Sequence, residues 1–558
     1  MINFLKTNLL ILIIILILCS YLGIKAFDEN GWDGWGFGSA ETLMSINYWA
    51  KDGFAKNYFL YLPRPYSKLI HYFDAPNPNR NNQTEILKNN LNDNGKFYSS
   101  YYTHYPSGYL IPYALMAKMG VSQRAIFRIF SILISLLGLT FLYRFIKSVS
   151  DKSVAIISLI YYGFSATFLN YADSISVQPL TYLFTYLILF LSILTLSNPD
   201  KSKKYNAAIW FSYLALSVSS YDTTVFIFAW LVGLDIIISR KFLWKKWFIF
   251  ASAPILGFAL QILQNAYYLG WPEMIKDFSR TYFTRQTEYG SLRNFVLGLS
   301  TPFAAITGLH LPHAFQRIGI TLFSAASILA IFWHLKERAM LSSKYFKILF
   351  ILVLASVIQP LFINITGLWE YQGSLTAPFW GLLIGAASVF TVSAFKQAHN
   401  YKSKEKILFG ILIAFITGLW SVQFYNTWYY VKDWPNNKPD SRVIEYAKII
   451  RAVESGKERI VFRTFSKNTI YASIFPTFNL EYYINIPTMD FFNNEELISN
   501  FWRLQNISQY PFYSIITGEK NDVEKIHKKI SVDLKNKGVG VIKPVRDHYL
   551  FVVEPIQK

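Results

Sequence analysis

The sequence predicts a polytopic α-helical membrane protein with about eleven transmembrane helices, a long first outer loop and a small α/β outer domain at the C-terminus. Three observations predict this class. The 558-residue chain is 53% hydrophobic and 18% aromatic, with a mean hydropathy of +0.25. Apolar runs of about 20 residues, the length of a helix that crosses a bilayer, recur along it. The loops between these runs alternate in charge.

The alternation of the loops predicts the orientation. One set of loops is rich in lysine and arginine, and cytoplasmic loops carry such an excess. These loops are Arg144–Lys152, Lys201–Lys204, Arg240–Lys246, Lys336–Lys347 and Lys396–Lys406. The other set carries acids, histidine, tyrosine and tryptophan, and we expect it to gather on the outer side. It comprises Asp28–Glu41, His104, Asp173, Asp222, Arg280–Glu288 and Glu370–Tyr371.

The first apolar run favours an uncleaved transmembrane helix over a signal peptide. It is longer than a typical signal-peptide core, and no small-residue cleavage site follows it. With the N-terminus inside and eleven spans, the C-terminus lies outside. The expected spans are about 7–25, 125–146, 153–170, 177–197, 206–221, 222–239, 247–269, 317–335, 346–366, 374–395 and 407–427.

A long polar outer loop, about 26–122, separates the first two spans. It contains Asn-, Pro- and Gly-rich stretches, a helical piece at Ser39–Lys51 and a short apolar piece at 107–119. The short piece is expected to lie at the membrane surface or to re-enter it. If it crossed, the basic residues after it would fall outside and break the charge pattern.

The chain changes character near residue 432, which divides it into a transmembrane domain (1–431) and an extracytoplasmic α/β domain (432–558). Helical spacing of apolar residues marks Arg442–Glu454 and Asp522–Lys537. Strand-like runs are Arg459–Arg463, Gly538–Ile542 and Tyr549–Val553. This alternation is typical of a small α/β domain.

The net charge of +20 does not indicate nucleic-acid binding, because much of it falls in predicted cytoplasmic loops that meet anionic lipid head groups. The single cysteine, Cys19, lies in the first apolar run and excludes an intrachain disulfide. No phosphate-binding loop, zinc-protease motif, CxxC or GxSxG occurs. We therefore expect no bound cofactor or metal.

Four carboxylates follow the first span closely: Asp28, Glu29, Asp33 and Glu41. Glycines between them permit tight turns, and the tryptophans there suit a membrane interface or the face of a sugar ring. An acid that is partly desolvated at the bilayer edge is suited to act as a general base. The alternative is that these acids only mark the outer end of a helix.

The end of the same loop carries His104 and Tyr105 within THYPSGY, Thr103–Tyr109. An imidazole at this place can bind a phosphate or assist proton transfer. Alternatively, His104 is hydrogen-bonded within an aromatic belt.

Further candidates lie at the other outer turns. Asp173 and Gln178 flank one of them. A carboxylate so close to hydrocarbon costs free energy, which makes it a candidate functional group. Asp222 is placed similarly, but an N-cap is the favoured interpretation there. Arg285 is a candidate phosphate contact, because arginine binds phosphate through two parallel hydrogen bonds. Glu370 and Tyr371 occupy the last such helix end.

This arrangement resembles the GT-C glycosyltransferase superfamily, in particular its protein-mannosyltransferase and aminoarabinose-transferase branches. The shared features are one helix followed by a long outer loop, an acid just after that helix, and the His/Tyr-Pro segment Thr103–Tyr109 before the next span. The resemblance implies a polyprenyl-phosphate sugar donor, a glycan, lipid or protein acceptor, and a first-loop acid that activates the acceptor hydroxyl. Asp33 is the first candidate for that base, with Asp28, Glu29 and Glu41 as rivals.

The resemblance also implies that His104 and Arg285 contact the donor phosphate or the acceptor, and that Asp173 and Glu370 line the sugar pocket. Two other classes of function fit the sequence less well. A transporter or flippase for lipid-linked sugars would often carry ionisable residues in mid-membrane and internal repeats, and the sequence shows neither. A non-enzymatic assembly or receptor protein would not explain the acids gathered at helix ends.

Overall fold

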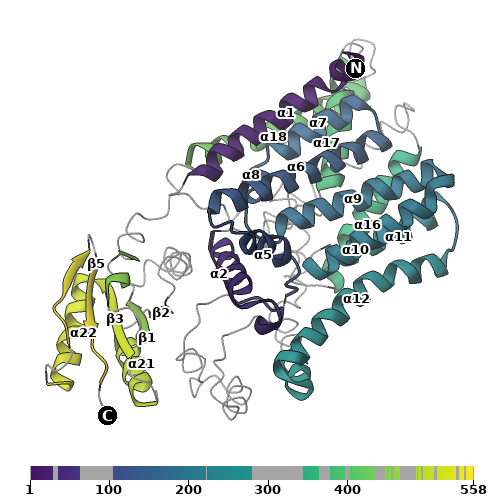
Figure 1. Cartoon of the computed structure of the whole chain (residues 1–558). Helices are drawn as coiled ribbons and strands as arrows, with labels where there is room; N and C mark the ends of the chain where they lie inside the picture. The colour runs from purple at the N-terminus through teal and green to yellow at the C-terminus, as the bar shows by residue number, and fades with distance from the viewer. Residues whose placement is uncertain are drawn as a thin grey trace.

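The structure is a computed structural model. It describes residues 2–28, 36–62, 103, 105–221, 223–279, 343–362, 377–395, 403–433, 447–448, 450–453, 458–464, 486, 488–491, 494–507, 512–535, 539–545 and 548–556. Most of these residues form helices, which make up one bundle in Figure 1. The helices and their bounds are α1 (Ile2–Phe27), α2 (Gly36–Asp52), α5 (Leu110–Lys118), α6 (Arg124–Val149), α7 (Lys152–Gly163), α8 (Ala166–Tyr171), α9 (Gln178–Ser197), α10 (Ser202–Ser219), α11 (Thr224–Gly233), α12 (Trp244–Leu269), α16 (Ser343–Phe362), α17 (Ala377–Phe395) and α18 (Ser403–Asp433).

Five helices of the described part are long and apolar enough to cross a membrane: Leu9–Phe27, Arg124–Val149, Gln178–Ser197, Trp244–Leu269 and Phe409–Lys432. Shorter apolar helices cover Lys152–Gly163, Thr224–Ile238 and Ala377–Ser393. The predicted span at 317–335 lies outside the described residues, so the expected total of eleven remains a prediction. At nine residues, or about 14 Å, α5 is too short to span.

The predicted span 153–170 is not one helix. It is divided between α7 and α8, because the chain leaves the helical conformation after Gly163 and becomes helical again at Ala166. The Ser165 hydroxyl caps the new helix by accepting a hydrogen bond from the Phe168 amide at 3.1 Å. Hydropathy alone gave no sign of this break, since the apolar composition continues across it.

The bundle is built around α9, which packs between α6 and α10, while α10 packs in turn against α12 (Figure 1). Gly138 lets α6 approach α9 closely, since a Cβ there would lie 3.0 Å from the Tyr182 backbone. The core beside this contact is aromatic: Tyr182 and Tyr186 stack, and Tyr186 donates to the Tyr162 hydroxyl at 3.0 Å. This packing fixes the ends of α6, α9 and α10, from which the turns predicted to lie outside extend.

The C-terminal part of the chain forms a five-stranded sheet in the order β2-β1-β3-β5-β4. The strands are β1 (Glu458–Thr464), β2 (Thr488–Phe491), β3 (Phe512–Glu519), β4 (Lys543–Val545) and β5 (His548–Val553). Strands β2, β1 and β3 are parallel, and β5 pairs antiparallel with β3 and with β4. Helices α21 (Asn494–Ile507) and α22 (Lys520–Asp533) pack on the sheet through apolar side chains such as Phe501 and Ile526.

Several details of this region differ from the prediction, among them that β2, β4 and α21 were not predicted. The run Gly538–Ile542 is not a strand; in its described part, Val539 forms only an isolated bridge to Val553. Two glycines in five residues weaken a strand, and the neighbouring Lys543–Val545 pairs with β5 instead. The buried strand β3 was missed, because its continuous FYSIITGE pattern lacks the alternation of a half-buried strand.

Candidate functional site

The predicted outer turns meet at one end of the bundle. The start of the first loop is linked to the turn at 172–177, since the Ile175 amide donates to the Ser39 hydroxyl at 3.0 Å. The end of that loop is linked to the last turn of α10: the Gly108 amide donates to the Val218 carbonyl at 2.9 Å. The Tyr105 and Ser220 hydroxyls are also 2.8 Å apart. Segments distant in sequence therefore form one continuous site.

Glu41 lies half-buried in the first half of α2, where a tyrosine holds its carboxylate. The Tyr61 hydroxyl donates to Glu41 Oε2 at 2.6 Å, a charge-assisted hydrogen bond that fixes the position of the acid. Tyr61 reaches it because the chain after α2 folds back along the helix, where Trp49 Nε1 donates to the Leu60 carbonyl at 3.0 Å. The Tyr61 ring lies 6.2 Å from that of Tyr109. Burial raises the pKa of the Tyr109 phenol, so it stays protonated beside the acid.

A strained turn supports this arrangement. Tyr58 and Phe59 both have positive φ, 55° and 56°, although neither is glycine. The Phe59 carbonyl accepts hydrogen bonds from the Ser107 hydroxyl and, at 3.4 Å, from Gln264 of α12. Tyr58 packs on Tyr268, with the ring centroids 4.9 Å apart. The contacts with α12 and with the end of the first loop stabilise a backbone conformation that costs free energy locally.

The segment Thr103–Tyr109 is held mainly by α12. The Thr103 carbonyl accepts hydrogen bonds at 2.9 Å from both Gln261 and Asn265, and its hydroxyl donates to Asp277 Oδ2 at 2.7 Å. Glycine is required at 108, because a Cβ there would lie 2.3 Å from the Val218 carbonyl oxygen. These bonds fix the backbone on both sides of His104, whose own placement lies outside the described residues.

Asp173 forms a buried ion cluster with two basic residues. Lys25 Nζ lies 2.8 Å from Asp173 Oδ1, and Arg128 binds Oδ2 through its Nε at 3.0 Å and through a second nitrogen. All three side chains are at most 1% exposed. Burial alone would raise the pKa of the Asp173 carboxyl, but the charges of Lys25 and Arg128 outweigh it and hold that pKa below its usual value. The cluster joins α1, α6 and the turn before α9.

Gln178 begins α9 and is buried in a chain of hydroxyl groups. It accepts a hydrogen bond from Ser176, whose hydroxyl lies 2.6 Å from that of Ser174. Tyr113 of α5 joins them by donating to the Ser176 carbonyl at 3.5 Å. The turn 172–177 is thus held from both sides, by the ion cluster and by these hydroxyls.

Asp28 directly follows α1, and its carbonyl accepts a 3.4 Å hydrogen bond from Arg124. The described site therefore brings together Asp28, Glu41, Tyr105, Asp173 and Gln178. The other candidates lie outside the described residues: Glu29, Asp33, His104, Asp222, Arg285, Glu370 and Tyr371.

The sequence interpretation missed three residues of the site. Lys25 and Arg128 lie at helix ends predicted to face outward, where basic residues run against the orientation rule, and that departure could have singled them out. Tyr61 gave no such sign, because tyrosine is frequent throughout this chain and only the fold brings it to Glu41.

The helices define a polytopic helical membrane protein whose candidate site residues are joined by hydrogen bonds at one end of the bundle. No family model matches the sequence, and no curated protein matches it in sequence. Solved structures do match. ArnT from Cupriavidus metallidurans bound to undecaprenyl phosphate has a TM-score of 0.51 and 11% sequence identity, over 98% of each chain. The archaeal oligosaccharyltransferase AglB from Archaeoglobus fulgidus, in complex with an inhibitory peptide and a dolichol-phosphate, has a TM-score of 0.48 and 11% identity, over 96% of this chain and 73% of its own.

ArnT and AglB are GT-C superfamily membrane glycosyltransferases. The likeness to ArnT extends over nearly the whole of both chains and shows a common fold. The likeness to ArnT therefore confirms the fold that the resemblance predicted for this chain.

Proposed function

We propose that this chain is an integral membrane glycosyltransferase that moves a sugar from a polyprenyl-phosphate donor to an acceptor hydroxyl on the outer side of the membrane. The observation that carries the proposal is the fold likeness to ArnT, whose matching structure holds undecaprenyl phosphate. The hydrogen bonds that join the first loop to the neighbouring turns support it, because a site for sugar transfer must hold its polar groups in fixed positions.

In the proposed reaction, the acceptor hydroxyl oxygen attacks the anomeric carbon of the sugar while a first-loop carboxylate accepts its proton. The bond from the anomeric carbon to the phosphate oxygen breaks, and the polyprenyl phosphate leaves with the electron pair. A single displacement inverts the anomeric centre. Asp33 is our first candidate for the base, with Asp28, Glu29 and Glu41 as rivals. Of these, Glu41 has the support of a 2.6 Å hydrogen bond that would orient it.

The other site residues receive proposed roles by their position. His104, Tyr105 and Arg285 would contact the donor phosphate or the acceptor, since cations and hydrogen-bond donors stabilise a departing phosphate. Asp173, Gln178, Glu370 and Tyr371 would line the sugar pocket. Because Asp173 is bound by Lys25 and Arg128, we propose that it acts there by holding the turn 172–177 in place.

We propose the orientation from the charge of the loops. The N-terminus and the basic loops lie in the cytoplasm, and the candidate site faces outward together with residues 432–558. The sheet of strands and helices in that C-terminal part supports an outer α/β domain. Such a domain would cover the site or select the acceptor.

The experiment that tests the function is transfer of radiolabelled sugar from synthetic polyprenyl-phosphate donors by the purified chain, with EDTA present. Asp33→Asn and Glu41→Gln remove a base without changing its size. Asp52→Asn is the matched control for Glu41→Gln, because it makes the same change of charge at the far end of α2. Tyr61→Phe removes the donor to Glu41, and we expect it to slow transfer about tenfold, the value of one charge-assisted hydrogen bond.

Label moved by the wild type and by Asp52→Asn, but lost in Asp33→Asn or Glu41→Gln, would establish the enzyme and locate its base. If no donor of a broad sugar panel is turned over, and both variants behave like the wild type in cells, the proposed function fails. The alternative of a transporter or flippase for lipid-linked sugars would then be favoured.

A further inference from the structure

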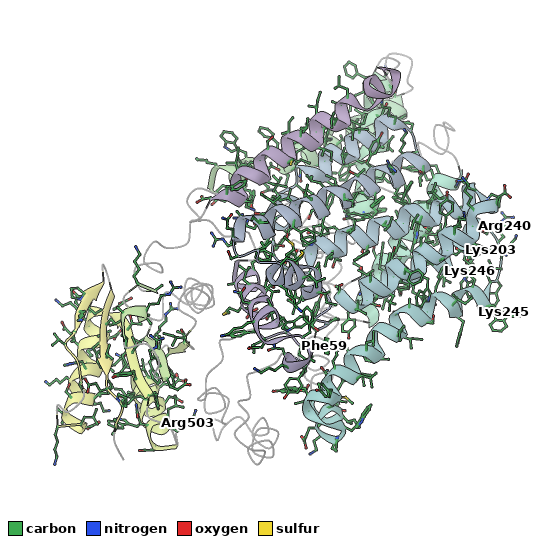
Figure 2. All side chains as sticks on the ribbon, in the orientation of Figure 1. Phe59, Lys203, Arg240, Lys245, Lys246 and Arg503 are labelled. Atoms are coloured by element: carbon green, nitrogen blue, oxygen red, sulfur yellow. The ribbon has the colours of Figure 1, made fainter. Side chains whose placement is uncertain are left out.

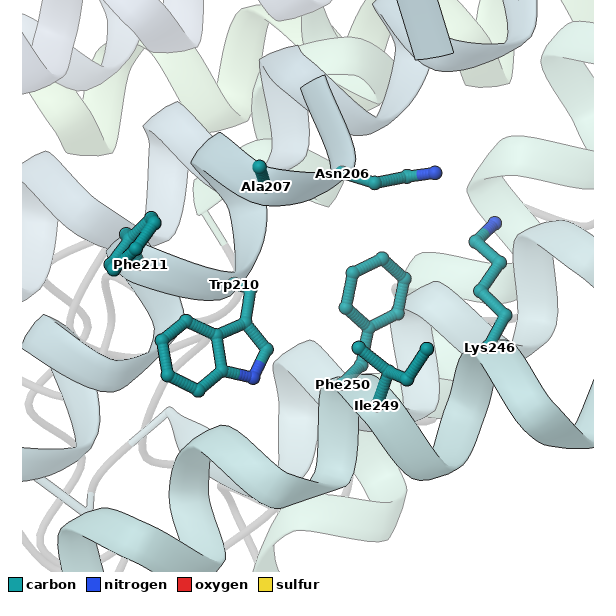
Figure 3. A pocket seen from close by; sticks show the side chains of 7 residues that line it. All are labelled: Asn206, Ala207, Trp210, Phe211, Lys246, Ile249 and Phe250. Atoms are coloured by element: carbon teal, nitrogen blue, oxygen red, sulfur yellow. The ribbon is translucent and has the colours of Figure 1, made fainter. Parts of the chain in front are cut away.

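A groove lies between the first turns of α10 and α12, at the opposite end of these helices from the candidate site (Figure 3). Its volume is about 520 Å³. The lining residues are Asn206, Ala207, Trp210 and Phe211 of α10 and Lys246, Ile249 and Phe250 of α12. From Asn206 to Val218 at the site, α10 rises by about 18 Å.

The groove exists because the two helices meet closely only farther along. Gly257 of α12 lies against Ser217 of α10, and a Cβ on that glycine would be 2.3 Å from the serine hydroxyl. Nearer the groove, Trp210 Nε1 donates to the Ser252 hydroxyl at 2.9 Å. Between these two contacts, Pro254 interrupts the hydrogen bonding of α12 and permits the helix to bend.

The groove is polar at one end and apolar along its length. Figure 3 shows the polar tips of Asn206 and Lys246 toward one side of the groove, with the rings of Trp210 and Phe250 also lining it. Lys246 is held in place by Asp235 at 2.8 Å. The Asn206 carboxamide oxygen is buried, and no partner for it occurs among the residues that the structure describes. A ligand that carries a polar head and an apolar tail fits this gradient.

The surroundings of the groove are strongly basic. Figure 2 labels Lys203, Arg240, Lys245 and Lys246 at this end of the bundle. Lys203, Arg240 and Lys245 are exposed, whereas the acid nearest to Lys246, Asp235, is buried and already paired. Aromatic side chains exposed beside the groove, at Phe242, Trp244 and Phe248, suit the interface between hydrocarbon and head groups.

We propose that this groove is a binding site for an anionic phospholipid. One acyl chain would lie along Trp210, Ile249 and Phe250, and the head group would meet Asn206, Lys246 and the surrounding basic residues. The charge complementarity selects an anionic lipid over a zwitterionic one. The site is separate from the proposed transfer site, so the two proposals stand or fall independently.

The test is native mass spectrometry of the purified full chain with phosphatidylglycerol or phosphatidylcholine of the same acyl chains. We expect the wild type to retain phosphatidylglycerol preferentially. Asn206→Asp adds one negative charge at the polar end, and we expect about a fivefold loss of phosphatidylglycerol with phosphatidylcholine unchanged. Asn198→Asp is the matched control, because it adds the same charge at an exposed position at the end of α9. Lys246 is not mutated, since its removal would leave the buried Asp235 without its cationic partner.

A second pair of variants tests the shape of the groove without changing charge. Ile249→Trp places an indole in the groove, whereas Ile255→Trp places one elsewhere on α12; the two isoleucines are 60% and 63% exposed. We expect lipid to be lost only in Ile249→Trp, with both variants melting near the wild type. Equal retention of the two lipids by the wild type, equal loss in Asn206→Asp and Asn198→Asp, or full retention in Ile249→Trp would each overturn the proposal.

Discussion

Replacing Asp173 by asparagine tests whether the buried ion cluster stabilises the end of the bundle that carries the candidate site. The change keeps the size of the side chain but removes the charge that compensates Lys25 and Arg128. Both basic side chains are at most 1% exposed, so water does not replace the lost carboxylate. Removal of one partner from a buried ion pair costs about 3–5 kcal/mol. Because two cations lose their partner here, we expect a loss of about 5 kcal/mol, the upper end of that range.

The assay is unfolding of the purified chain by SDS in mixed micelles, followed by tryptophan fluorescence. Asp200→Asn is the control, because Asp200 is exposed and its loss should change stability by about 0.5 kcal/mol or less. The triple variant Lys25→Met/Arg128→Met/Asp173→Leu removes all three charges at once. We expect it to recover most of the stability, since apolar replacements of a buried ion triad are often neutral.

Two results would refute the reasoning. If Asp173→Asn unfolds within about 1 kcal/mol of the wild type, the cluster does not depend on its carboxylate. If the triple variant is less stable than Asp173→Asn, then shape rather than uncompensated charge explains the loss. A triple variant that folds but transfers no sugar would show that the cluster also positions the proposed site.

The remaining predictions concern the backbone of the site and its dependence on pH. Gly108→Ala forces a Cβ to within 2.3 Å of a carbonyl oxygen and should destabilise the fold in the same SDS assay. Gly23→Ala is the control, because a Cβ there meets no atom within 4 Å. Equal destabilisation by the two variants would contradict the close approach at Gly108. Thr103→Val removes the hydroxyl that donates to Asp277, whereas Thr103→Ser keeps it. We expect the free energy of unfolding to fall by about 1.5–3 kcal/mol only in the valine variant. Similar unfolding of both variants would show that this hydrogen bond does not stabilise the fold. The pKa of Asp173 is lower in the folded than in the unfolded chain. Its contribution to the free energy of unfolding is therefore fully present above the unfolded pKa of about 3.9, and it is lost as the pH falls through the folded-state pKa. The stability difference between wild type and Asp173→Asn should therefore be constant from about pH 5 to pH 8, and a decline within that window would count against the cluster.

Much of the helical bundle could be predicted from the sequence. Hydropathy located α1, α6, α9 and α12 to within a few residues, because a bilayer demands a long apolar helix wherever the chain crosses it. It did not show that one predicted span is divided at Ser165, since the break depends on a single cap within an apolar run. In the C-terminal part, strand β1 was predicted but β3 was not, because a strand buried on both faces loses the alternation that marks an exposed one.

The candidate site could be predicted only in part. The sequence singled out Asp28, Glu41 and Asp173, because acids at helix ends near hydrocarbon are costly and are candidates for a functional site. What each acid contacts could not be derived. Tyr61 lies 20 residues from Glu41, and Arg128 lies 45 residues from Asp173. No spacing rule links such pairs, since they meet only after separate helices have packed.

The sequence by itself determined that this protein is a membrane bundle with its unusual polar residues at one set of helix ends, because the pattern of apolar and basic residues responds directly to the bilayer. Only the tertiary structure decided which of those residues are bound to one another. Packing neutralised Asp173 between Lys25 and Arg128, set Tyr61 on Glu41, and left a groove where α10 and α12 separate. Such contacts depend on the angles and distances between helices, and these are fixed by the whole bundle rather than by any one segment.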